Sequence, residues 1–458
     1  MAQPLRDLIA ANQFFTLEWE PLLRCIHDAF PSELERLKSA YSIPAPGKKP
    51  KPAAPPPHDH HRHGVSHVSH QNQSQNQSEN QNGNEGENQS PSQILFGRSY
   101  DEVDRTLVSI DALRMIHNDE YARFAATQDG GVRMQRDSFD WIRKLYREVI
   151  TGSNEESDSG FDPLELRPEP EMLYTLVTSV IINDLGKSAG LEADLKKEVG
   201  GGDGDGEDDV EHVNHDLLIH QVIQRAPQLI PCLDSLAPSH RADLELGIEL
   251  GAYFNFGQLA QAENVPASLV GLDCVRGKMA AFELRFVEQI LDIAGSAGHE
   301  DHGHAKKLTE PIFRSYRLVY DLARRYINGE VDKRGAYDEN LRRRLNALVQ
   351  EGRWEGREDL DIAIPEHRAL MRLLCICNAN TAKSAELVEE TFHHYISSDT
   401  RRILVRGLNL DGSVDNPAVQ ATYIPAVCST AITAAKSHPQ GDPRQALGAQ
   451  SLNVISEN

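Results

Sequence analysis

Long hydrophobic runs are missing from the 458-residue sequence, and so are the usual signs of a membrane or secreted protein. The longest clean apolar stretch is about Leu173 to Ile182, whereas a membrane span needs roughly 20 residues. The first residues, MAQPLRDLIAANQFF, lack the basic start and apolar core of a secretory signal. Six cysteines in a chain of this length do not make a disulfide framework and fit a reducing cytosol. We therefore expect no membrane span and a cytoplasmic location.

Basic residues are also in short supply, with 47 Lys and Arg against 69 Asp and Glu and a net charge of -22. Such a balance argues against a general nucleic-acid coat or a membrane-surface binder. The charge is uneven, however, because residues 154–216 are strongly acidic and residues 303–344 are basic. G-x-S-x-G, Walker A, G-x-G-x-x-G and protein-kinase motifs are absent, so chemistry driven by ATP or NAD is unsupported. We expect no cofactor and no metal.

Strand signals are scarce as well, because few Val-, Ile- and Thr-rich alternating stretches are bounded by hairpin turns. Apolar residues instead recur at helical spacing, most strongly over 241–264, 278–294 and 311–327. The sequence therefore predicts a mostly α fold, a single multi-helix domain with long disordered inserts. The expected divisions are an N-terminal helical segment (1–43), a disordered linker rich in Pro, His, Gln and Asn (44–92), a helical catalytic domain (93–430) with an acidic loop insert (191–212), and a flexible C-terminal tail (431–458).

Three segments have some features of metal-binding sequences. A flexible tract in the linker contains His58, His60, His61, His63, His67 and His70, and such a tract can bind Zn or Ni. The acidic insert contains GGGDGDGEDD, which lacks the full ligand spacing of a calcium loop. The turn GHEDHGH at 298–304 lacks the H-E-x-x-H spacing of metalloproteases. For each segment we favour the simpler interpretation, a polar linker, a solvated loop and a polar turn.

Two short polar motifs flank the acidic insert. Asn183-Asp184-Leu185-Gly186-Lys187 ends an apolar helix, and Asn214-His215-Asp216 precedes another apolar run. If the insert is a compact loop, the two motifs are expected to lie close together. A His-Asp pair at a helix start is used by metal-dependent phosphohydrolases of the HD class, in which a metal activates water. The first motif has Asn183 where that class requires His, and the alternative is that Asp184 and Asp216 cap helix ends.

The region 245–264 has a polar face without a single Lys or Arg. Carboxylates and carboxamides of this kind suit a cationic, donor-rich ligand such as a guanidinium, although the face could simply be solvated. The residues on it are Glu245, Glu249, Asn255, Gln258, Gln261 and Glu263. Further along, Glu283 and Arg285 form an expected structural ion pair inside an apolar helix.

A histidine and a group of basic residues follow. His299 lies on a flexible, hinge-like turn, AGSAGH, and is a candidate general base. Lys306, Lys307, Arg314 and Arg317 begin a basic helix that either follows a phosphate backbone or is merely solvated. The other stripe of this helix, with Ile312, Phe313, Tyr316 and Val319, is expected in the core.

These motifs occur in an order that resembles a known family. The blocks are NDLGK at 183, NHD at 214, GIELGAYFNFGQLAQAEN from 247, AFELRF from 281, AGSAGH from 294, KKLTEPIF from 306 and QATYIPA from 420. Together they span about residues 100 to 430 and resemble a group of fungal proteins, some of which are arginine-containing cyclodipeptide synthases. The paired-aspartate motif of that family, D-D-x-x-E, has no match, because Asp208-Asp209 lies in the low-complexity insert without the following Glu.

The resemblance implies an aminoacyltransferase of fungal secondary metabolism that condenses arginine from Arg-tRNA with a second aminoacyl-tRNA-derived residue. The product is a cyclo(Arg-Xaa) diketopiperazine, which downstream tailoring enzymes modify. Because an aminoacyl ester is already activated, no ATP site is needed, but a base for the α-amine is. In this interpretation the residues have the following roles: Asp184, His215, Asp216 and His299 in catalysis, Asn183, Lys187, Glu283 and the polar face at 245–264 in substrate binding, and Lys306, Lys307, Arg314 and Arg317 on the tRNA. The alternatives are an HD-like metal-dependent phosphohydrolase and a non-catalytic helical scaffold.

Overall fold

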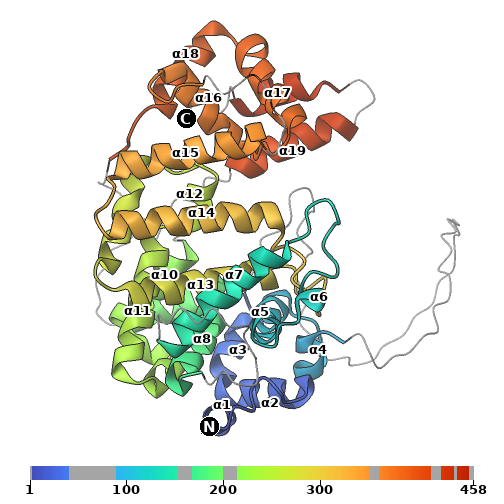
Figure 1. Ribbon diagram of the computed structural model, residues 1–458. Coiled ribbons are helices and arrows are strands. Elements are labelled where there is room, and N and C mark those ends of the chain that lie inside the picture. Colours follow the sequence, from blue (N-terminus) through green and yellow to red (C-terminus); the bar gives the residue numbers. More distant parts are fainter. Residues whose placement is uncertain are drawn as a thin grey trace, which may run out of the picture.

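Helices account for nearly all regular structure in the computed structural model (Figure 1). It describes residues 3–40, 89–152, 168–199, 214–350, 354, 356, 360–413, 424–437 and 441–452. In those ranges the one strand-like pairing is an isolated antiparallel bridge between Ala40 and Ser188. The predicted mostly α fold is therefore confirmed. None of the described helices is long and apolar enough to cross a membrane.

The first half of the chain supplies α1 (Gln3–Ala10), α2 (Trp19–Ala29), α3 (Pro31–Leu37), α4 (Pro91–Phe96), α5 (Asp101–His117), α6 (Tyr121–Phe124), α7 (Arg136–Thr151), α8 (Pro170–Ile182), α9 (Ala189–Val199) and α10 (His215–Arg225). The second half supplies α11 (Pro238–Tyr253), α12 (Phe256–Ala260), α13 (Met279–Gly295), α14 (Glu310–Ile327), α15 (Lys333–Gln350), α16 (Pro365–Ile376), α17 (Ala382–Glu390), α18 (Ser398–Leu408), α19 (Ile424–Ser437) and α20 (Pro443–Leu447). Short 3-10 turns lie at Leu185–Lys187 (η1), Pro227–Leu229 (η2), Pro231–Ser235 (η3) and Pro266–Val275 (η4), and π turns at Thr391–Tyr395 (η5) and Gly448–Leu452 (η6).

Helices α8 and α13 lie at the centre of the lower body in Figure 1. Both are apolar around most of their circumference, so they are surrounded by other helices rather than by water. Helix α13 packs against α5, α7, α8 and α11, and α8 also packs against α1 and α5. Each of these central helices nevertheless has charged residues on it or directly after it, and those charges form the site described below.

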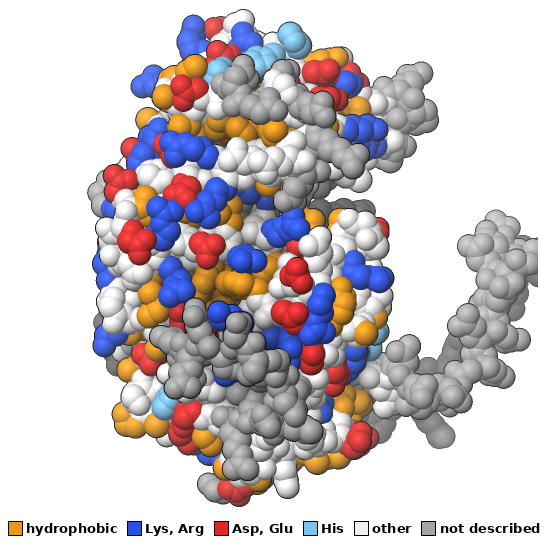
Figure 2. Space-filling model, viewed as in Figure 1, with side chains coloured by type: hydrophobic (Ala, Val, Ile, Leu, Met, Phe, Trp, Pro, Cys, Tyr) orange, Lys and Arg blue, Asp and Glu red, His pale blue; other side chains and the backbone are white. Residues whose placement is uncertain are grey.

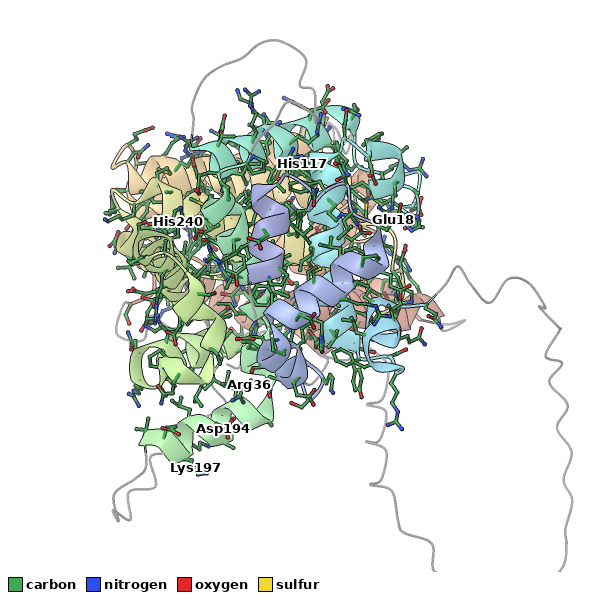
Figure 3. All side chains as sticks on the ribbon, turned by 90° about the horizontal axis from the view of Figure 1, so that it is seen from below. Glu18, Arg36, His117, Asp194, Lys197 and His240 are labelled. Carbon is green, nitrogen blue, oxygen red and sulfur yellow. The ribbon has the colours of Figure 1, made fainter. Side chains whose placement is uncertain are left out.

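The N-terminal segment is part of this body. Phe14 and Phe30 are fully buried, and the ring of Phe15 stacks on that of His117 from α5, with centroids 3.5 Å apart. Figure 3 shows His117 next to the N-terminal helices. The expected linker ends earlier than predicted, because Ser90 closes a capping box with Gln93 and starts α4. Residues 44–88 of that linker, with the histidine tract, lie outside the described residues.

Two predicted irregular segments are partly helical instead. The predicted loop 191–212 is wrong as far as residue 199, because Leu191 and Leu195 bury one face of α9. Asp194 of α9 forms an ion pair with Arg36, 2.8 Å long, and Figure 3 shows that α9 stands at the edge of the body. Residues 200–212, including Asp208 and Asp209, lie outside the described residues.

The predicted flexible tail 431–458 is also wrong over residues 431–437 and 441–452, which are largely helical. Leu447 of α20 and Leu452 of η6 are fully buried in a group of helices that includes α17 and α19, shown in orange and red in Figure 1. Arg372 of α16 ties this group to the segment after α12, since its guanidinium donates to the carbonyls of Ala262 (3.0 Å) and Asn264 (2.7 Å).

Candidate functional site

The two polar motifs that flank the insert meet at the end of α8. Gly186 lies so close to His215 that a Cβ at this glycine would overlap the backbone oxygen of His215. Lys187 then turns inward, and its Nζ lies 2.8 Å from Asp184 Oδ1 and 3.0 Å from Glu102 Oε2 of α5. The predicted proximity of the two motifs is therefore confirmed, and a buried lysine holds the first motif to α5.

The first turn of α10 positions His215 between two carboxylates. Asn214 caps the helix, because its Oδ1 accepts the backbone N–H of Asp216 at 3.0 Å. His215 Nε2 lies 3.8 Å from Asp184 Oδ1 and 3.7 Å from Asp216 Oδ2. The capping interpretation of Asp184 and Asp216 is wrong, because neither side chain caps a helix and both face the histidine.

Arg285 of α13 connects the second motif to the first motif and to Glu288. Its Nη2 donates to Asp216 Oδ1 at 3.1 Å, and its Nη1 donates to Asn183 Oδ1 at 2.8 Å and to Glu288. The guanidinium reaches these partners because α11 has glycines against it, and a Cβ at Gly251 would lie 2.5 Å from Arg285 Nη2.

The expected ion pair between Glu283 and Arg285 is wrong. Arg285 instead binds the partners just described. Glu283 lies on another side of α13 and accepts a hydrogen bond from the Tyr320 hydroxyl, 3.1 Å long. Side chains two positions apart on a helix point in directions about 200° apart. Arg285 therefore faces Asp216 and Asn183, and Glu283 faces α14.

A chain of contacts extends from Glu102 through Arg105 to His299. Arg105 Nη1 donates to Glu102 Oε1 at 2.6 Å, and its Nε donates to His299 Nδ1 at 3.1 Å. Because Nδ1 accepts this bond, the neutral ring has its hydrogen on Nε2. Burial and the charge of Arg105 also lower the pKa of His299. In this arrangement His299 has no free basic nitrogen, which makes it a weaker candidate base than His215.

The turn that contains His299 is not a hinge. Gly295 ends α13 where it crosses α5, and a Cβ at Gly295 would overlap the Ser109 hydroxyl and lie 2.6 Å from the Ser109 backbone nitrogen. At Gly298 a Cβ would lie 2.7 Å from the carbonyl oxygen of Asp104. The two glycines therefore permit close helix packing, which places His299 against Arg105.

Carboxylates outnumber fixed cations in this cluster. Burial raises the pKa of Glu102 to about 7, of Glu288 to about 8 and of Asp292 to about 6, and nearby carboxylates add to each effect. Burial acts in the same direction on Asp184, but Lys187 and His215 outweigh it, so the pKa of Asp184 lies below its usual value. We call this set the buried charge cluster; its members are Glu102, Arg105, Asn183, Asp184, Lys187, His215, Asp216, Arg285, Glu288 and Asp292.

Most members of the cluster are buried. The side chain of His215 is 28% exposed, and Asp292 is half-buried. Glu102, Lys187 and Glu288 are buried. His215, Asp292 and Arg105 are therefore the members of the cluster that keep partial exposure.

The predicted polar face of 245–264 does not join the cluster as one surface. Glu245 forms an ion pair with Arg241, 2.8 Å long, just before the stretch that lacks basic residues. Glu245 and Glu249 each lie two residues from Gly247, which packs on Arg285, so both face away from the cluster. Asn255 caps α12, with Oδ1 3.0 Å from the Gln258 nitrogen.

The far end of this face serves the fold instead. Gln261 ends α12. Glu263 accepts the backbone N–H of Ile424 at 2.9 Å, which ties it to the start of α19. The substrate-binding residues predicted in this region therefore lie in different parts of the fold. None of the charged ones lies next to His215.

The predicted basic helix begins later than expected. Helix α14 starts at Glu310, so Lys306 and Lys307 lie in the turn before it, where Lys306 Nζ is 3.4 Å from Glu300. Arg314 pairs with Glu310 at 2.6 Å, and the exposed Arg317 lies over the Trp141 ring. In the apolar stripe, Phe313 and Val319 are fully buried and Tyr316 is half-buried, but Ile312 is 37% exposed, so its expected core position is wrong.

In the described part of the chain, no group of three or more His, Cys, Asp or Glu side chains is arranged to hold a metal ion. His304 lies 2.7 Å from Asp301, and His302 Nδ1 lies 2.6 Å from the carbonyl oxygen of Gly298. Asp184 and Asp216, the ligands that an HD-class metal would need, are already paired with Lys187 and Arg285.

Four members of the cluster were absent from the sequence-based prediction: Glu102, Arg105, Glu288 and Asp292. A signal for two of them exists, because Arg285, Glu288 and Asp292 are spaced i, i+3 and i+7 on one face of an otherwise apolar helix. Glu102 and Arg105 are three residues apart near the start of α5, where acidic residues are common at any helix N-terminus.

The described residues therefore form an all-helical body with a largely buried charge cluster. The chain belongs to a family of unknown function (DUF6829), whose model matches residues 23–452. The match begins within α2 and extends through the C-terminal helices to η6, consistent with their place in the core. No curated protein and no solved structure matches the chain.

Proposed function

We propose that the protein is an aminoacyltransferase that condenses arginine, delivered as Arg-tRNA, with a second aminoacyl-tRNA-derived residue to form a cyclo(Arg-Xaa) diketopiperazine. One observation supports this proposal above others. The blocks at 183, 214, 247, 281 and 294, on which the resemblance to arginine-containing cyclodipeptide synthases depends, all contribute to or pack against the buried charge cluster.

The chemistry requires little beyond positioning and proton transfer. In each of two steps an α-amine attacks an ester carbonyl, an amide bond forms, and the ribose oxygen leaves with a proton. His215, half-buried between Asp184 and Asp216, accepts the proton from the amine and returns it to the leaving oxygen. The two carboxylates orient the ring and stabilise its protonated form.

The surplus of carboxylates suits an arginine substrate. Asp292 is half-buried, and Glu288 Oε1, about one turn earlier on α13, is buried without a hydrogen-bond partner. A guanidinium from the substrate supplies donors and positive charge to such oxygens. In the HD-like alternative a divalent metal would first have to displace Lys187 and Arg285 from Asp184 and Asp216.

Expression of the full chain in a yeast or bacterial host, with mass spectrometry of the medium, tests the proposal. We expect cyclo(Arg-Xaa) products from the wild type and a loss of roughly 100-fold or more for His215→Gln, as for removal of a general base. Asp194→Asn, on the outer helix α9, is the matched control and should keep full yield. Soluble protein without any arginine-containing cyclic dipeptide refutes the proposal.

A second experiment tests the tRNA path. Lys307 and Arg317 are exposed, so Lys307→Glu combined with Arg317→Glu should leave the melting temperature nearly unchanged. If these residues contact phosphates, the variant should bind Arg-tRNA more weakly and with a log–log salt slope smaller by about two. An unchanged slope and yield would remove this surface from the tRNA path.

A further inference from the structure

A cleft of about 640 Å³ lies where the N-terminal ends of α7 and α14 approach α15 and the loop at residues 379–380. Part of its lining comes from the loop before α7, which rises toward the upper helices in Figure 1. Its volume is in the range of pockets that hold drug- or nucleotide-sized molecules. The lining contains no member of the buried charge cluster among the described residues. The cleft is therefore a second candidate site.

Four arginines and one acid line this cleft. The acid, Glu310, is buried at its base, where it accepts hydrogen bonds from Ser138 Oγ (2.9 Å) and Arg314 Nε (2.6 Å). Its charge is thereby compensated within the fold. The arginines are Arg133, Arg136, Arg314 and Arg344. Figure 2 shows basic side chains gathered on the surface over α14 and α15.

Two of these guanidinium groups have only neutral partners. Arg344 donates to the Ser315 hydroxyl and, at 3.4 Å, to the Asn380 side chain. Arg133 donates to the backbone carbonyl of Gln128 at 3.3 Å. Neither lies within ion-pair distance of a carboxylate in the ranges that the structure describes, whereas Arg136 pairs with two aspartates. The cleft therefore presents positive charge that an anionic ligand can neutralise.

The rest of the lining provides an apolar surface and two helix starts. Pro311, Ala347 and Leu348 form part of the wall, so a flat apolar group fits beside the arginines. Helices α7 and α14 both begin at the cleft, and the Glu310 carboxylate already lies at both starts, where it accepts the backbone N–H of Gln135 at 2.7 Å. Arginines and apolar residues lie side by side in this lining, because Arg344 shares a face of α15 with Ala347 and Leu348, and this mixture suits a phosphate joined to a nucleobase.

We propose that this cleft binds a nucleoside phosphate, with the phosphate on Arg133 and Arg344. The ligand is either a free nucleotide or the terminal nucleotide of an RNA. The binding itself does not depend on the proposed reaction; if that reaction is correct, the RNA source is the acceptor end of the aminoacyl-tRNA.

Equilibrium binding to the purified full chain tests this proposal with three probes: adenosine 5′-monophosphate, adenosine, and a four-nucleotide RNA that ends in CCA. We expect adenosine to bind at least tenfold more weakly than the monophosphate. Tighter binding of the RNA identifies an RNA end as the source, and equal or weaker binding identifies a free nucleotide. The comparison of probes uses the wild type alone, so it does not depend on how any variant folds.

Arg344→Gln and Arg133→Gln should each weaken binding of the monophosphate about tenfold, as expected for one lost charge-assisted contact. Arg402→Gln is the matched control. Arg402 is exposed on α18, so this substitution removes the same charge at a site away from the cleft. Equal binding of adenosine and its monophosphate, no binding of any probe at millimolar concentration, or an equal effect of Arg402→Gln overturns the proposal. A failure here leaves the cyclodipeptide assay intact, because that assay measures product and not nucleotide affinity.

Discussion

Lys187 is the residue on which the buried charge cluster depends most, because it lies between two buried carboxylates. Lys187→Met should lower the free energy of unfolding by about 3 kcal/mol, since it leaves Glu102 and Asp184 without their shared cation. Denaturant unfolding measures this loss. Adding Glu102→Gln should recover part of it, because one uncompensated charge is removed. Lys196→Met, at an exposed pair on α9, should change stability by less than about 0.5 kcal/mol.

His117 should make the protein sensitive to mild acid. Burial lowers its pKa from 6.5 to about 4, so between these values the unfolded chain binds more protons than the folded one. The stability contributed by the neutral ring is complete above pH 6.5 and should be about 2 kcal/mol smaller at pH 5. His117→Gln keeps a hydrogen-bonding group near Tyr146 but does not titrate. Its unfolding free energy should therefore fall less between pH 8 and pH 5, and an identical fall in both proteins would contradict the assignment.

At the scale of single helices, the crossing of α13 over α5 depends on Gly295. A Cβ at Gly295 meets both side-chain and backbone atoms of Ser109, so the helices must separate. Gly295→Ala should cost about 2 kcal/mol in thermal or denaturant unfolding. Ser109→Ala should rescue it only in part, because the backbone clash stays. Gly407→Ala on α18, where nothing lies within 4 Å, should instead stabilise slightly.

Helix positions followed well from the sequence where apolar spacing was regular. The predicted helices 278–294 and 311–327 correspond to Met279–Gly295 and Glu310–Ile327. The predicted stretch 241–264 breaks after Tyr253, because Phe254 is extended and Asn255 caps a new helix. A local polar residue such as Asn255 can cap, face water or bind a ligand, and spacing alone does not distinguish these roles.

The site was predictable only where its residues interrupt an apolar pattern. Asp184 and His215 stood out because polar motifs end or begin buried helices, and the structure brings them together. Glu245 and Glu249 stood out for the same reason, but they are directed away from the cluster. The direction of a side chain depends on which neighbour a helix packs against, and that depends on long-range contacts such as those of Gly247 and Gly251 with Arg285.

For the whole molecule, the C-terminal helices should behave as part of the fold and not as a tail. Ending the chain at residue 440 removes α20 and η6 and exposes the surfaces that bury Leu447 and Leu452. Loss of two such side chains corresponds to roughly 3 to 6 kcal/mol. We expect a markedly lower melting temperature or insoluble protein. A chain that ends at residue 452 is the control and should melt like the full-length protein.

Because carboxylates outnumber cations in the buried charge cluster, its protonation should change when a cation binds. Near pH 7, Glu288 is mostly protonated and Glu102 is partly protonated, and an added positive charge beside them would expel these protons. Binding of an arginine-like cation at Asp292 should therefore release protons into solution. Calorimetry in buffers of different ionisation enthalpy would reveal this as a binding heat that depends on the buffer. Glu288→Gln should reduce the number of protons released. Proton release would then be a direct measure of cation binding at the cluster.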